Sequence, residues 1–117
     1  MAALETADFL IEGAIAIVRG DGTVLREGVI ASDDGRIVFI GPSGDLTSQV
    51  ARRPGAMRID ASGCTVFAAG SALVSGASLD VIIARGDAAD AVAPAAEAIR
   101  MEIAAGKIVR WEQELPT

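Results

Sequence analysis

The side chains that could do chemistry in this sequence are carboxylates, arginines and one thiol, because the 117 residues include no histidine. Histidine is the usual general base beside a serine or cysteine nucleophile and the commonest metal ligand. Its absence excludes Ser-His and Cys-His catalysis and any histidine-ligated metal centre. What remains open is a site built from carboxylates or from the single cysteine.

Four aspartates stand where carboxylates could bind a hard cation. Asp80 and Asp87 lie at the start and the end of a predicted strand, and Asp33-Asp34 precedes a glycine. No EF-hand spacing of further oxygen ligands follows Asp33-Asp34. We therefore interpret Asp80 and Asp87 as strand-edge and capping residues and Asp33-Asp34 as a turn, and we predict no metal site.

Other reactive or charged groups also have simple structural interpretations. Cys64 has no basic neighbour in sequence and falls in a strand pattern, which favours a buried structural thiol over a nucleophile. The stretch 20–23 (GDGT) lacks the Gly-Lys-Ser/Thr of a phosphate loop, and Arg52-Arg53 is typical of a solvated loop. Trp111 is interpreted as covering the core rather than anchoring an interface. We predict no catalytic or cofactor-binding residue and no cofactor.

The composition bounds the partners and the compartment. The net charge is −6 and aromatic residues make up 3% of the chain, so nucleic acid and anionic membrane surfaces are not expected partners. The first residues lack the pattern of a signal peptide, and no apolar run reaches the ~20 residues that span a bilayer. One cysteine cannot form an internal disulfide, which fits a reducing compartment. We expect a cytoplasmic protein.

Short apolar segments separated by glycine turns predict a mainly β fold in a single domain. The expected strands are Phe9–Arg19, Val24–Ser32, Arg36–Gly41, Met57–Ser62, Cys64–Ala69, Leu79–Arg85 and a final hairpin that turns at Ala105-Gly106.

Glycines and helix formers refine this outline. We expect a bend at Gly13, a bulge at Gly28 and a hairpin turn at Asp21-Gly22. Asp45 or Ser43 could cap one helical turn through Val50, and Arg52–Gly55 is expected to be a loop. The alanine-rich stretch Asp87–Arg100 favours helix, capped by Asp87, with a second short helix from Pro94 to Ile99.

Two hairpins resemble each other, DGRIVFIG at Asp34–Gly41 and AGKIVRW at Ala105–Trp111. The matched positions are too few to indicate a duplication. Two such hairpins could still pair across a sandwich.

The first 70 residues carry two motifs in a characteristic order, DGRIVFIG at Asp34–Gly41 and IDASGCTVFAAG at Ile59–Gly70. Together they resemble the N-terminal β-domain of the amidohydrolase superfamily, where D-G-R-I-V-x-I-G precedes I-D-A-x-G-x-x-V-x-P-G. Position 69 is alanine where the family usually has proline. The family continues with F-x-D-x-H-x-H, whose histidines bind the metal, whereas Ser71-Ala72-Leu73 follow here.

The remaining residues resemble the same enzymes after their catalytic barrel. Ser71–Ile83 matches much of the family's G-S-L-x-x-G-x-x-A-D-L-V-V-L strand, and Asp87–Arg100 is similar to a late segment of cytosine-deaminase-like members. The resemblance implies that residues 1–70 and 71–117 flank a missing barrel of ~250 residues. It also implies that they meet in one sandwich, joined by a loose linker at Gly70–Gly76. Leu79–Arg85 should then lie against the sheet that holds Arg36–Gly41. Natural loss and engineered excision of the barrel both stay open.

The expected fold is therefore a composite β-sandwich or open barrel of mixed strands over residues 1–117, with one or two short helices. The resemblance implies a non-catalytic module that is no enzyme on its own. It would form a homodimer through the apolar face that the barrel covers in the family. Two alternatives are an accessory subunit of a separate barrel hydrolase acting on C–N bonds, and a module that binds a small ligand in a cavity of the sandwich.

Overall fold

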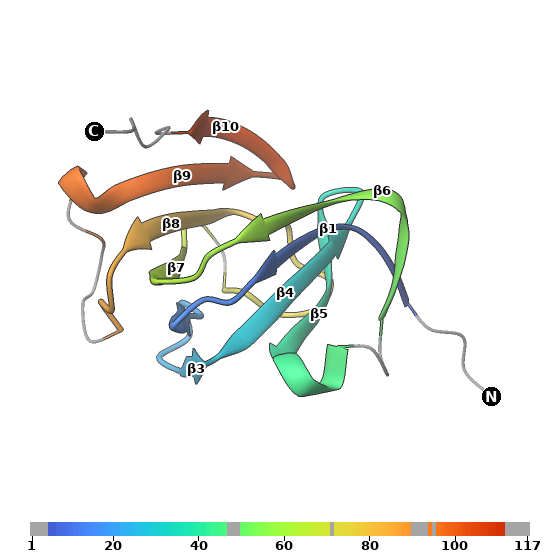
Figure 1. Cartoon of the computed structure of the whole chain (residues 1–117), viewed down its shortest axis with the longest axis horizontal. Coiled ribbons are helices and arrows are strands. Elements are labelled where there is room, and N and C mark those ends of the chain that lie inside the picture. The colour runs from blue at the N-terminus through green and yellow to red at the C-terminus, as the bar shows by residue number, and fades with distance from the viewer. Residues whose placement is uncertain (1–4, 47–49, 71, 90–93, 95, 112–117) are drawn as a thin grey trace.

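The computed structural model describes residues 5–46, 50–70, 72–89, 94 and 96–111. These residues form two sheets, with two single 3-10 turns and no closed barrel (Figure 1). Both sheets mix parallel and antiparallel neighbours, since β1 pairs with β6 and β2 with β7 in parallel. The predicted mainly β sandwich of mixed strands is confirmed.

The smaller sheet has four strands in the order β5-β4-β1-β6. Their bounds are Arg36–Pro42 for β5, Gly28–Asp33 for β4, Glu5–Glu12 for β1 and Val50–Asp60 for β6. The larger sheet has the order β10-β9-β8-β7-β2-β3. Its bounds are Lys107–Trp111 for β10, Ile99–Ala104 for β9, Val81–Arg85 for β8, Cys64–Ala68 for β7, Ala16–Val18 for β2 and Val24–Arg26 for β3.

One buried cluster lies between the sheets and draws on both halves of the sequence. Its largest members from residues 1–70 are Phe9, Ile11, Ile17, Ile30, Ile37 and Val66. Its largest members from residues 71–117 are Leu73, Leu79, Val81, Ile83, Met101 and Ile103. Because neither set can bury its apolar surface without the other, the core itself joins the two halves.

The bend expected at Gly13 is present, with φ of +81° where the chain leaves β1 for the other sheet. The single strand expected over Val24–Ser32 is wrong. It divides into β3 and β4 at Glu27, whose φ is +52°, and the two parts join different sheets. Gly28 is no bulge but a point of close packing, since a Cβ there would lie 2.4 Å from a methyl group of Leu25.

The loop expected at Arg52–Gly55 is also wrong, because these residues lie within β6. The parallel register with β1 runs to Ala7↔Arg52 and resumes at Phe9↔Met57, with Gly55 at φ +80° in the intervening bulge. Pro54 has no N–H to donate, and it is tolerated because β6 is an edge strand.

Little of the predicted helix is present in the part of the chain that the structure describes. A 3-10 turn, η1, covers Ser43–Asp45 without a side-chain cap, and a second, η2, covers Ala96–Ala98. The strand β9 then begins at Ile99, inside the segment expected to be helical. Most of the first alanine-rich helix falls on residues 90–93, outside the described residues. The β-branched Ile99 and Ile103 prefer the sheet, where Ile103 is buried.

Leu79–Arg85 is joined to the turn that begins Arg36–Gly41 but does not lie in the same sheet. The strand β8 belongs to the six-stranded sheet and β5 to the four-stranded sheet, so the two segments share no sheet. Ile37 of β5 and Val81 of β8 nevertheless belong to one buried cluster between the sheets. The connecting residues are also bonded, because the Leu79 N–H donates to the Gly35 carbonyl at 2.9 Å.

Candidate functional site

The first site of interest is the junction at residues 68–80, where the family resemblance places the missing barrel. Its two ends are hydrogen-bonded to each other, since the Ala69 N–H donates to the Asp80 carbonyl at 2.9 Å. The Leu73 N–H donates to the Arg19 carbonyl at 2.8 Å, and the Leu73 side chain is fully buried in the core.

The expectation of a loose linker at Gly70–Gly76 is therefore wrong for its described residues. The Gly76 N–H donates to the Ile37 carbonyl at 2.7 Å, and the Ile37 N–H donates to the Ala77 carbonyl at 2.8 Å. Among the small residues of this segment, Leu73 is the anchor, because its side chain is buried whereas that of the neighbouring Val74 is 40% exposed.

The two similar hairpins meet at their turns. A Cβ on Gly106 would lie 2.6 Å from the Gly35 Cα, and a Cβ on Gly35 would lie 2.5 Å from the Ala105 carbonyl oxygen. The Gly106 N–H donates to the Leu79 carbonyl at 3.1 Å. Backbone thus packs directly on backbone at this point, which only glycine permits.

Asp80 and Asp87 both make hydrogen bonds to backbone beside β8, although no helix begins at Asp87 in the described part of the chain. Asp80 accepts a hydrogen bond from the Ala105 N–H at 2.8 Å and so supports the last hairpin turn. Asp87 accepts one from the Ala89 N–H at 3.2 Å and one from Arg26 at 3.0 Å. The Arg26 guanidinium lowers the pKa of Asp87 below its ordinary value, because it hydrogen-bonds to the charged carboxylate.

The neighbouring residues Asp33 and Asp34 have different structural roles. Asp33 is held in a two-point ion pair with Arg53, both contacts being 2.8 Å, and this hydrogen bonding lowers the Asp33 pKa. Asp34 lies in the turn itself, at φ +53°. A second two-point pair joins Glu12 of β1 to Arg58 of β6 and lowers the pKa of Glu12.

The other candidates are placed as follows. Cys64 is half-buried on β7 and packs against the core cluster. The stretch 20–23 forms the β2–β3 turn, where Asp21 accepts a hydrogen bond from the Thr23 N–H at 3.0 Å. Arg53 is in an ion pair rather than a solvated loop. The side chain of Trp111 lies outside the described part of the structure.

No three Asp, Glu or Cys side chains among the described residues come together in a way that could hold a metal ion. The same part of the chain contains no helix that could span a membrane.

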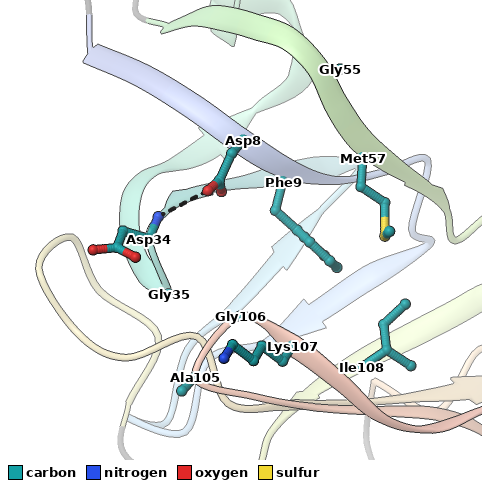
Figure 2. Close-up of a pocket in the computed structure, with 10 residues that line it drawn as sticks. All are labelled: Asp8, Phe9, Asp34, Gly35, Gly55, Met57, Ala105, Gly106, Lys107 and Ile108. Atoms are coloured by element: carbon teal, nitrogen blue, oxygen red, sulfur yellow. Dashed lines mark hydrogen bonds between the residues drawn. The ribbon is translucent and has the colours of Figure 1, made fainter.

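A cleft of about 710 Å³ opens between the two sheets beside their edge strands β6 and β10 (Figure 2). Phe9 and Met57 point into it from β1 and β6, toward Lys107 and Ile108 of β10. Asp8 stands at its side and accepts a hydrogen bond from the Asp34 N–H at 3.2 Å.

The sequence reading missed this cleft. The one available signal was the alternation of Met57 and Ile59 along an edge strand, which places both on the face toward the core. Ile59 packs against the core, whereas Met57 is 48% exposed at the opening.

No protein-family model matches the chain, and no curated protein sequence matches it. Solved structures do match part of it. An adenosine deaminase from Xanthomonas campestris with bound zinc matches with a TM-score of 0.46 and 26% identity, over 55% of this chain and 14% of that one.

Two further structures match to a similar extent. An N-acyl-D-glutamate deacylase from Bordetella bronchiseptica, in complex with zinc and a phosphonate inhibitor, matches with a TM-score of 0.41 and 34% identity over 55% of this chain. A molinate hydrolase matches with a TM-score of 0.43 and 24% identity over 56%. The chain spans only 12–14% of the length of these three proteins. These three solved structures are members of the amidohydrolase superfamily.

Proposed function

We propose that this chain is a non-catalytic β-sandwich module of the amidohydrolase type, without the catalytic barrel, which acts by packing against a partner. The observation that carries the proposal is the closed junction. The Ala69 N–H and the Asp80 carbonyl are hydrogen-bonded, and Leu73 fills the core between them. The chain passes directly from the motif before the barrel to the strand after it.

The residue types support the same conclusion. A metal-dependent hydrolase needs ligands that hold the metal and a group that activates water. The sequence has no histidine to supply either, and its aspartates at positions 80 and 87 are engaged in backbone and arginine contacts.

Assays on deaminase and amidase substrates, with and without added zinc, test the non-catalytic part. We expect no turnover above background and no zinc retained after dialysis. Turnover that copurifies with the folded protein and disappears on chelation would refute the proposal.

Self-association is the form of packing that we propose. Four large apolar side chains are exposed among the described residues: Val24 at 43%, Met57 at 48%, Val74 at 40% and Val109 at 65%. Three of them lie on β3, β6 and β10, and Val74 lies in the connection between β7 and β8. Because they do not share one strand or sheet edge, the expected dimer is a weak, concentration-dependent one.

Sedimentation analysis across the micromolar range tests this part. The weight-average sedimentation coefficient should rise with protein concentration toward that of a dimer. A constant monomer value would contradict self-association and leave packing against a different protein, such as a separate barrel subunit, to be sought by copurification.

A further inference from the structure

The cleft between β6 and β10 has the chemistry of a small-molecule site. Its volume of about 710 Å³ falls in the range of ligand-binding pockets. Its apolar wall is formed by Phe9, which is 6% exposed, by the half-exposed Met57 and by Ile108. A ligand that covers the half-exposed Met57 side chain would bury apolar surface that now contacts water, which favours binding.

Charges of both signs border this apolar wall. Lys107 is exposed, and its ammonium group makes no hydrogen bond or ion pair with any other described residue. The Asp34 carboxylate likewise makes no hydrogen bond or ion pair with the described part of the chain. Asp8 has one oxygen occupied by the Asp34 N–H. The neighbouring Arg53 attracts Asp8 and Asp34 through space, but both its hydrogen bonds go to Asp33, which leaves the carboxylate of Asp34 without a hydrogen-bond partner in the described part of the chain.

The end wall of the cleft is rigid. It consists of the Asp34-Gly35 and Ala105-Gly106 turns, which touch backbone to backbone with no room for a Cβ on either glycine. Asp34 and Lys107 both border this contact, so their backbone positions are fixed relative to each other. A site whose walls are formed in advance spends less binding free energy on ordering.

We propose that this cleft binds a small zwitterion with an apolar body, of the class of an apolar amino acid or dipeptide. The ligand ammonium group faces Asp8 and Asp34, its carboxylate faces Lys107, and its apolar side chain covers Met57 and Phe9. The site shares Met57 with the exposed apolar side chains proposed for self-association, but the two proposals have separate tests, so either can fail without the other.

The test is a titration of the ¹⁵N-labelled full chain with L-leucyl-L-leucine, followed by amide chemical shifts. We expect saturable shifts confined to the cleft, at Asp8, Phe9, Met57 and the 105–108 turn. Leucyl-leucinamide, which lacks the carboxylate, and N-acetyl-leucyl-leucine, which lacks the ammonium group, should each bind several-fold more weakly. Glycylglycine, which lacks the apolar side chains, should not bind.

Variants assign each charge. Lys107→Gln should weaken the binding of leucyl-leucine several-fold and leave the binding of leucyl-leucinamide unchanged. The two peptides should then bind this variant with equal affinity. Asp34→Asn should weaken the binding of leucyl-leucine and leave that of N-acetyl-leucyl-leucine unchanged. Asparagine tolerates the left-handed backbone at this position. Arg85→Gln, on β8, is the matched surface control and should change nothing.

Three results would overturn the proposal. The first is an absence of shifts at millimolar dipeptide. The second is shifts of equal size for all four peptides, which would indicate contact without recognition of charge. The third is shifts in the cleft that follow protein concentration rather than peptide, which would make the cleft an interface between two copies of the chain.

Discussion

Replacing Leu73 by alanine tests whether the segment that joins the two halves belongs to the core. The Leu73 side chain is fully buried within the main cluster, and the backbone on either side of it is hydrogen-bonded to Arg19 and Ile37. Removal of a leucine side chain from such a site costs about 2–5 kcal/mol, through lost burial and the cavity left behind.

That cost is a large part of the whole, because domains of this kind are stable by ~5–15 kcal/mol. For a chain of this length the loss corresponds to a fall in Tm of about 8–20 °C. Urea unfolding followed by far-ultraviolet circular dichroism measures it, and the midpoint should fall while the slope stays unchanged.

The neighbouring residue supplies the matched control. Val74 is 40% exposed, so Val74→Ala should change the unfolding free energy by less than about 0.5 kcal/mol. If Leu73→Ala lowers the unfolding free energy no more than Val74→Ala does, the segment only connects the two halves, and the closed junction is refuted.

Three further predictions follow from single contacts. Gly106→Ala should cost at least about 1 kcal/mol more than Gly63→Ala in urea unfolding, because both glycines have φ +76° but only Gly106 has backbone within 4 Å of the new Cβ; equal costs would contradict the packing of the two hairpin turns. Arg53 lowers the Asp33 pKa in the folded state, so the pair stabilises the fold above the unfolded pKa of about 3.9, and this stabilisation is lost as the pH falls through the lower pKa of the folded state. Arg53→Gln should therefore destabilise the protein at pH 7 and make little difference at pH 2, with Arg85→Gln as the control, and an equal effect at both values would refute this. Asp87→Asn should weaken the contact to Arg26 and leave the Tm within about 2 °C, because both side chains are half-exposed; a larger fall would show a role beyond this surface pair.

Local sequence signals predicted the strands and turns well wherever a turn fixed them. Asp34-Gly35 and Ala105-Gly106 have the left-handed backbone that two-residue hairpins need, and both hairpins form. Local signals failed where the structure of a segment depended on which sheet it joins. Glu27 divides one apolar run between two sheets, and nothing in its own side chain indicates that.

The neighbouring strand also determined the secondary structure of residues 52–55 and of the end of the alanine-rich stretch. Arg52 continues β6 because β1 lies beside it, although Pro54 and Gly55 alone favour a loop. Ile99 enters β9 because β8 offers an unpaired edge, which overrides the helix preference of its alanine neighbours.

The site residues divide in the same way. The contacts of Asp80 and Asp87 agree with the structural roles read from their places beside a strand. The cleft could not be found from sequence, because Asp8, Met57 and Lys107 lie on three strands that come together only in the folded chain.

Native-state hydrogen exchange tests most directly whether residues 1–70 and residues 71–117 unfold as one unit. The strands β7 and β8 are hydrogen-bonded neighbours, one from each half of the sequence. The amides of Val66 and Ile83 should therefore exchange with one shared opening free energy, equal to that of global unfolding. If the amides of β8 and β9 open at a much lower free energy while β1, β4 and β7 stay protected, residues 71–117 are only docked on the sandwich, and its closure as a single fold is contradicted.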